Sequence, residues 1–176
     1  SIDFVPEQLR GKLYSDYDEA LSNYDGNLTY ISLPNTLHYF WAKKALHNKL
    51  HVIIDKPSVT KLSQCKELTS LAKQKSLCIA EANVWNYHPL AKKILSYFNN
   101  YGKPLNINMI FTSPKLDKNN FRYNTKLGSG IILDRASYVI SCGKLFYNQK
   151  PIKIHCSVNK VDKLNNVDIS AAISLI

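Results

Sequence analysis

Three polar side chains stand at positions where a proton could be transferred. Lys56 follows the apolar run 51–54 and precedes Pro57, whereas Asp134 and Tyr138 lie four residues apart in an apolar segment. Residues spaced by four share one face of a helix, so Asp134 and Tyr138 could point into one cleft. A lysine whose pKa is lowered by burial or by neighbouring cations can give or take a proton, as a tyrosine can. These three residues are candidates for general acid–base chemistry.

Structural roles for the same residues stay open at this point. Lys56 could occupy a surface turn before Pro57, and the bond between them is a candidate for the cis form. Asp134 could lie in the first turn of a helix, where the macrodipole favours a carboxylate. Tyr138 could belong to the core.

Alternating strand and helix patterns predict how these residues are positioned. Short β-rich or apolar runs at 28–33, 51–54 and 77–80 are separated by two helical patterns. Such alternation with short links favours parallel strands joined by right-handed crossovers. Ligands of open α/β sheets bind beyond the carboxyl ends of the strands, which is where Asn35 and Lys56 would lie.

The first of these helices should begin just after Pro34. Asn35 could cap this helix, contact a ligand, or do both, and His38 would either pack on the sheet or face the ligand. Four apolar residues recur at helical spacing and should form the buried face of the helix. They are Leu37, Phe40, Trp41 and Ala45.

The second half of the chain has a different pattern, which predicts an α+β domain. Its expected elements are a helix from Pro89, strands at 105–111, 152–158 and 168–176, and a helix at 131–146. Long strands of alternating polarity indicate a largely antiparallel sheet with one open face. We therefore expect one domain at 1–85 and a second at 86–176.

The net charge of +10 invites a nucleic-acid interpretation that the basic residues do not support. The chain has 23 Lys and Arg against 13 Asp and Glu, and the part after residue 88 holds 13 of these basic and 4 of these acidic residues. Three of the basic residues are arginines, the side chain that reads base edges best. A lysine-rich, solvated surface is the simpler explanation, and we expect no nucleic-acid partner.

The four cysteines are widely spaced and form no metal or redox motif, so we expect no metal site. Cys78 and Cys156 lie in apolar runs and should be buried thiols, which fits the reduced cytoplasm. No apolar run reaches the roughly 18 residues that indicate a membrane span, and we expect no membrane partner.

Several short motifs, among them Pro-Asn-x-x-His and Asp-Lys-Pro, occur in one order along the chain. They are Tyr30–His38, His51–Pro57, Glu81–Pro89, Asn120–Arg122, Leu127–Gly130 and Asp134–Tyr138. This ordered set resembles the Gfo/Idh/MocA (glucose–fructose oxidoreductase/inositol dehydrogenase) family of NAD(P)-dependent oxidoreductases. The resemblance implies an α/β fold, with a partial Rossmann-like parallel sheet followed by an α+β domain with a largely antiparallel open-faced sheet.

The resemblance also implies roles for individual residues. NAD or NADP would be bound by Ser32, Leu33, Pro34, Asn35, His38, Asp55 and Lys56. Lys56, Asp134 and Tyr138 would be catalytic, moving the proton that accompanies hydride transfer at a sugar, cyclitol or nucleotide-sugar hydroxyl or carbonyl. Asn86 and Arg122 would contact the substrate, although Arg122 could instead fix the loop around it. The open sheet face would join copies of the chain into a homo-oligomer.

Three positions depart from the family pattern. Asp55 replaces the usual Glu, Asn86 stands where relatives often carry Arg, and Ala136 replaces a Gly. The bulky Arg135 precedes Ala136, and together they would narrow the approach of a substrate.

The six glycines do not form a glycine-rich dinucleotide turn after an opening strand. We therefore expect the chain to be an internal portion of a longer oxidoreductase, which an intact mass measurement would test. A non-catalytic ligand sensor or assembly protein of the same fold, and a basic polyanion-binding module, remain as alternatives. Cofactor titration tests the first alternative, and binding to nucleic acid at physiological salt tests the second.

Overall fold

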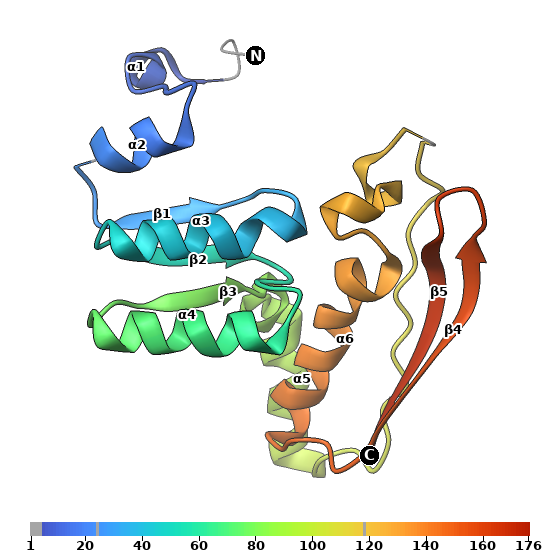
Figure 1. Ribbon diagram of the computed structural model, residues 1–176. Coiled ribbons are helices and arrows are strands. Elements are labelled where there is room, and N and C mark those ends of the chain that lie inside the picture. The colour runs from blue at the N-terminus through green and yellow to red at the C-terminus, as the bar shows by residue number, and fades with distance from the viewer. Residues whose placement is uncertain (1–4, 24, 118) are drawn as a thin grey trace.

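The computed structural model describes residues 5–23, 25–117 and 119–176, and Figure 1 shows their arrangement. The helices are α1 (Glu7–Arg10), α2 (Tyr17–Asn23), α3 (Asn35–His47), α4 (Leu62–Gln74), α5 (Pro89–Tyr101) and α6 (Ile131–Tyr147). The strands are β1 (Leu28–Ile31), β2 (His51–Asp55), β3 (Ile79–Ala82), β4 (Ile154–Asp162) and β5 (Val167–Leu175). Short 3₁₀ turns are η2 (Val84–Tyr87), η3 (Phe121–Tyr123) and η4 (Thr125–Leu127).

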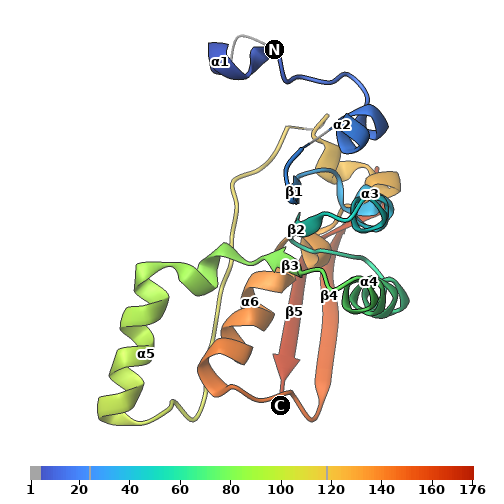
Figure 2. The same ribbon diagram turned by 90° about the vertical axis from the view of Figure 1, so that its left-hand side faces the viewer.

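The first three strands form a parallel sheet in the order β1-β2-β3, with Ile31 opposite Ile54 and Ile54 opposite Glu81. Helices α3 and α4 lie together on one side of this sheet (Figure 2). The core between helices and sheet consists of Ile31, Ala42, Ala45, Leu46, Leu50, Val52, Ile54, Leu68 and Ala72. The predicted parallel α/β arrangement is therefore confirmed.

Helix α3 buries only part of the predicted face, since Ala45 is fully buried and Trp41 packs against the core, whereas Leu37 and Phe40 are exposed. Its buried residues are His38, Ala42, Ala45 and Leu46. Small alanines let a helix backbone approach a sheet closely. Phe40 is 50% exposed and meets Trp41 edge-on at 5.2 Å. The predicted cap is also wrong, because Pro34 takes the N-cap position and no side chain within the described ranges caps α3.

The second part of the chain places α6 against β5 and leaves β4 on the outside (Figure 1). β4 and β5 pair antiparallel from Ile154 opposite Leu175 to Asp162 opposite Val167. Every residue of β4 before Asp162 is exposed, whereas most of β5 is at least partly buried. The predicted antiparallel sheet with an open face is confirmed.

The strand predicted at 105–111 is wrong for the described part of the chain, in which this segment has no regular secondary structure. Alternating polarity marks a segment that could form a strand, but a strand also needs a partner backbone. β4 and β5 pair with each other. Leu105 and Ile110 are accordingly exposed, at 103% and 84%.

The two thiols that were expected to be buried are exposed. Cys78 precedes β3 at the edge of the parallel sheet, and Cys156 lies on the open strand β4. Cys142 of α6 is buried instead, and burial raises the pKa of its thiol. All four cysteines fall in the described ranges and are free thiols. None of the described helices is long and apolar enough to cross a membrane.

Candidate functional site

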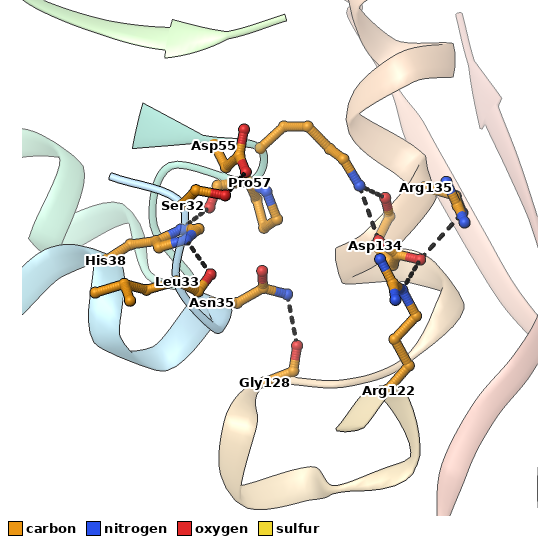
Figure 3. A network of polar contacts seen from close by, with 11 residues as sticks. Ser32, Leu33, Asn35, His38, Asp55, Pro57, Arg122, Gly128, Asp134 and Arg135 are labelled. Atoms are coloured by element: carbon orange, nitrogen blue, oxygen red, sulfur yellow. Dashed lines mark hydrogen bonds and ion pairs between the residues drawn. The ribbon is translucent and has the colours of Figure 1, made fainter. Parts of the chain in front are cut away.

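The carboxyl ends of β1 and β2 lie side by side and bring segments 32–35 and 55–57 to one edge of the parallel sheet. The first turns of α6 and the loop that contains η3 and η4 face this edge (Figure 3). The predicted site residues lie on these facing segments, except for His38 in α3 and Asn86 in η2.

Lys56 joins the two sides by direct contact with α6. Its ammonium Nζ lies 2.8 Å from Asp134 Oδ1 and also donates a hydrogen bond to the Asp134 backbone carbonyl. Both side chains are largely buried, at 14% and 15% exposed. The Lys56–Pro57 peptide bond is cis, as predicted. The fold therefore brings together two candidate residues that are 78 positions apart in the sequence.

Two arginines share the other carboxylate oxygen of Asp134. Arg122 Nε donates a hydrogen bond to Oδ2 at 3.0 Å, and Arg135 Nε lies 3.0 Å from the same oxygen (Figure 3). The second contact is an ion pair without hydrogen-bond geometry, since Arg135 Nε is buried and has no hydrogen-bond partner among the described residues. One carboxylate thus faces three cations, and the group as a whole is positively charged.

Asp134 is ionised at neutral pH because its partners outweigh its burial. Burial alone would raise the pKa of this carboxyl group, since the carboxylate loses solvation. The hydrogen bond from Lys56 and the charges of Lys56, Arg135 and Arg122 lower the pKa below its ordinary value of 3.8. The carboxylate therefore organises the three cations around it.

The Asp55 carboxylate is held by two hydroxyl groups at the carboxyl end of β1, one inside the strand and one just after it. Tyr30 donates a hydrogen bond to Oδ1, and Ser32 Oγ donates one to Oδ2 at 2.8 Å. The hydrogen bond to Asp55, together with burial and the charge of Asp55, raises the pKa of Tyr30 above 10.0. The Tyr30 hydroxyl therefore keeps its proton, and an acidic, hydroxyl-rich group lies at the sheet edge.

His38 is fully buried and bridges two backbone carbonyl groups. Its Nε2 lies 2.6 Å from the Leu33 carbonyl oxygen, and its Nδ1 lies 2.9 Å from that of Pro57. The ring thereby ties the end of β1 to the loop after β2, next to Lys56. Both ring nitrogens are used in this way, so the geometry favours the packing interpretation of His38 over direct contact of its ring with a ligand.

Asn35 connects the first turn of α3 to the second part of the chain. Its Nδ2 donates a hydrogen bond to the Gly128 carbonyl oxygen at 2.7 Å, and Thr36 Oγ1 donates one to that of Lys126 at 3.2 Å. Gly128 has a φ of +72°, and a Cβ atom there would lie 3.1 Å from Asn35 Cβ. This close contact helps to bring the loop around η4 to the sheet edge.

Tyr138 lies one turn after Asp134 and contacts Lys56 through its ring. The Lys56 ammonium is 5.1 Å from the centroid of this ring, on which Phe111 also stacks.

Asn86 lies in η2, outside these contacts. Its Oδ1 is buried without a hydrogen-bond partner in the described part of the chain. A substrate-contacting role for Asn86 remains a prediction from the resemblance.

Three contributors to this arrangement escaped the sequence-based prediction. Tyr30 carried a signal, because it lies two residues before Ser32 and side chains at this spacing share one face of a strand. Phe111 and Arg135 carried none, since their positions depend on contacts between distant segments. Arg135, which was expected to obstruct the substrate, is paired with Asp134.

A pocket of about 220 Å³ opens beside the cation group. Its lining includes the charged residues Lys115, Arg122, Asp134 and Asp168. The residues that the structure describes include no group of three or more His, Cys, Asp or Glu that could hold a metal ion. The pocket offers a small polar molecule both donors and acceptors beside the Lys56–Asp134 pair.

Gly130 should be essential for the start of α6 and hence for the position of Asp134. Its φ is +114°, and a Cβ atom there would lie 2.1 Å from Asp168 Oδ1. Asp168 Oδ2 accepts a hydrogen bond from the Ile132 amide at 2.8 Å, so the clash would disturb the helix start. We expect Gly130→Ala to lower the free energy of unfolding by about 2 kcal/mol, as measured by urea unfolding at neutral pH.

Gly143→Ala is the matched control within the same helix. A Cβ atom at Gly143 would lie 3.7 Å from Leu175, which is an ordinary contact. Helix propensity then favours the alanine by up to about 1 kcal/mol. Equal stabilities of the two variants would show that Gly130 is not constrained in this way.

The chain matches known proteins along most of its length. A family model for Gfo/Idh/MocA proteins, described as "Oxidoreductase family, NAD-binding Rossmann fold", matches residues 1–82. The chain is 28% identical over 142 residues to a dTDP-3,4-didehydro-2,6-dideoxy-alpha-D-glucose 3-reductase of Actinomadura kijaniata, a match that covers 80% of this chain and 43% of that protein. It is 24% identical over 135 residues to D-xylose 1-dehydrogenase (NADP(+)) 2 of Haloferax volcanii, covering 76% and 42%. The chain thus spans less than half the length of these curated relatives.

Solved structures share the fold. A 3-ketoreductase from Actinomadura kijaniata, in complex with NADP and TDP-benzene, matches with a TM-score of 0.77 at 23% identity, covering 90% of this chain and 49% of that one. An NAD-binding protein from Listeria innocua matches with a TM-score of 0.74 at 17% identity, covering 91% and 48%. The family resemblance inferred from the ordered motifs is therefore confirmed. Residues 1–82 of the chain match the Gfo/Idh/MocA family of oxidoreductases, with its NAD-binding Rossmann fold.

Proposed function

We propose that the protein is an NAD(P)-dependent oxidoreductase that acts on a hydroxyl or carbonyl group of a sugar, cyclitol or nucleotide-linked sugar. The observation that carries this proposal is the partly buried Lys56–Asp134 pair, which joins the carboxyl edge of the parallel sheet to α6. The match of residues 1–82 to the oxidoreductase family and the names of the curated relatives, two of which act on a dTDP-sugar and on D-xylose, support it.

The residues at the sheet edge fit the nicotinamide end of the cofactor. Asp55 with its two hydroxyl partners, and Asn35 at the start of α3, are hydrogen-bonding groups that suit an amide and ribose hydroxyls. They lie where nucleotides bind in open α/β sheets. Bound NAD(P) would supply or accept the hydride at the carbon that bears the reacting oxygen. Residues 1–85 would contribute to this cofactor half and residues 86–176 to the substrate half.

Lys56 would carry the proton that accompanies this transfer. Its ammonium is fixed by Asp134 and faces the Tyr138 ring, so few of its side-chain conformations remain open. Holding a proton donor in place before the reaction lowers the entropic cost of the transition state. Tyr138 would share the proton, and Asp134 would hold Lys56 and accept a hydrogen bond from the substrate.

The substrate would bind beside Arg122, in the pocket next to the cation group. The three cations around Asp134 exceed its single charge, and a partly buried excess of positive charge favours an anionic ligand. A phosphate-bearing sugar, such as a nucleotide-linked sugar, meets this condition better than a neutral one.

Two further observations support a proposal about the compartment and the assembly of the protein. Four free thiols suit the cytoplasm, where disulfides are rare. The open face of the β4–β5 sheet exposes large apolar residues, among them Ile154, Val158 and Val161, and a second copy of the chain would cover them. We therefore propose a cytoplasmic homo-oligomer.

The test is a fluorescence titration of the whole protein with NADH and NADPH, followed by absorbance assays at 340 nm with neutral and nucleotide-linked sugars. We expect cofactor binding and turnover, with a preference for the phosphate-bearing substrates. Cofactor binding without turnover of any sugar would support a non-catalytic sensor of the same fold. Absence of cofactor binding would exclude the proposed function.

A further inference from the structure

Lys56 and three side chains near it form a continuous stack. The Lys56 ammonium lies 5.1 Å from the centroid of the Tyr138 ring. Tyr138 and Phe111 stack with their centroids 5.4 Å apart and an angle of 9° between the rings. The guanidinium carbon of Arg135 lies 5.0 Å from the centroid of Phe111. Two aromatic rings thus lie in series between a lysine and an arginine.

The cations at the two ends of this stack both contact the Asp134 carboxylate. Lys56 Nζ lies 2.8 Å from Asp134 Oδ1, and Arg135 Nε lies 3.0 Å from Oδ2. Each cation is therefore held by an aromatic face and by an anion, and five residues make a closed ring of contacts. Cations are attracted to aromatic faces, and the attraction grows as water is excluded.

The ion pair with Asp134 does not by itself explain the position of Arg135. The buried Nε group makes no hydrogen bond to Oδ2 or to another described residue, in spite of its short distance from the carboxylate. A planar guanidinium gains most from a carboxylate when its N–H groups point at the oxygens. Its place over Phe111 is a second contact that fixes its orientation.

Phe111 belongs to a segment that is not held in place by strand pairing. Residues 105–111 form no strand in the described chain, and the nearby side chains of Leu105 and Ile110 point to solvent. Phe111 is 43% exposed and contacts both Tyr138 and Arg135 of α6. It therefore anchors this segment to the face of α6 that carries Asp134.

We propose that Phe111 and Arg135 are positioning residues that fix the Tyr138 ring and thereby hold the Lys56 ammonium against Asp134. A lysine side chain has four rotatable bonds, and holding it in one conformation requires contacts on more than one side. Asp134 supplies one side and the ring of Tyr138 supplies another. This role goes beyond the family motifs, and it rests on the proposed function only in that Lys56 is the proton carrier.

The test measures how fast Lys56 reacts with a small amine-acylating reagent at fixed pH, by peptide mass mapping, with exposed Lys93 of α5 as the internal reference. We expect Phe111→Leu to raise the labelling rate of Lys56 relative to Lys93 about fivefold, as the loss of one stacking contact implies. Phe111→Tyr should restore the slow rate. Arg135→Lys, which keeps the charge but loses the planar group, should raise the rate in the same way.

Tyr101→Leu is the matched control, because Tyr101 is 83% exposed and lies at the end of α5. It should leave Lys56 labelling unchanged. An unchanged Lys56 rate in Phe111→Leu would overturn the positioning role. The labelling needs no turnover, so a protein that fails the sugar assays but shows this pattern would disprove the proposed function and keep the positioning role.

Discussion

Replacement of Lys56 by alanine should lower kcat by about 10²–10⁴-fold, the range that a positioned proton donor contributes. The affinity for NAD(P) should change much less, because Ser32, Asn35 and Asp55 remain at the sheet edge. The reason for the loss is geometric, since Lys56 is the side chain that reaches from this edge to Asp134. The measurement is absorbance at 340 nm for turnover and fluorescence titration for the cofactor.

Lys56→Arg separates the proton carrier from a structural cation. Arginine keeps the positive charge and the ion pair with Asp134 but does not release its proton at neutral pH. We expect a melting temperature close to that of the wild type with turnover as low as in Lys56→Ala. Lys61→Ala, an exposed lysine beside α4, is the control and should retain full activity. Wild-type turnover in Lys56→Arg would rule out the assigned role.

Local patterns in the sequence were sufficient to predict the parallel sheet and the helices that cover it. The runs 28–33 and 51–54 carry strand signals and the segments between them carry helical periodicity, so the parallel sheet followed from alternation alone. The predictions failed where the structure of a segment depends on a distant part of the chain that packs against it or pairs with it. Segment 105–111 alternates in polarity but lacks a paired neighbour in the described chain, and the closest packing on α3 favoured alanines over Phe40.

The sequence predicted those residues of the candidate site that belong to short motifs. Lys56 and Asp134 were selected by type and position, and the structure joins them. Asn35 was a candidate cap of α3 or ligand contact, whereas it donates to Gly128, which is 93 residues away in the sequence. No local pattern encodes a contact of this range. The same reason explains why Arg135 was interpreted as an obstacle and Phe111 as a strand residue.

Asp134 should be the residue of this site on which stability depends most. Asp134→Asn removes the charge that Lys56, Arg122 and Arg135 share, and leaves partly buried cations without their anion. Breaking a buried pair costs about 3–5 kcal/mol, and the exposure of Arg122, at 34%, reduces this to about 2–3 kcal/mol here. Urea unfolding at pH 7 measures the loss.

The loss should depend on pH in a direction that the pKa of Asp134 determines. Folding lowers this pKa below 3.8, so the carboxylate stabilises the folded state fully above pH 3.8. As the pH falls through the lower pKa of the folded state, wild-type Asp134 becomes protonated and the contribution disappears. The wild type and Asp134→Asn should therefore differ at pH 7 and converge once the pH has fallen below that lower pKa.

Asp18→Asn supplies the control for this comparison, because Asp18 forms an ion pair of similar length with Lys44 at the surface. The Lys44 Nζ lies 2.5 Å from Asp18 Oδ1, but the Asp18 side chain is 57% exposed. Water and salt screen such a pair, so its removal should change stability little at either pH. If Asp134→Asn were as stable as Asp18→Asn at pH 7, Asp134 would not be the anion that holds the three cations together. A loss that persisted unchanged below the lowered pKa of Asp134 would place its cause in packing, since the side chain at position 134 is then uncharged in both proteins.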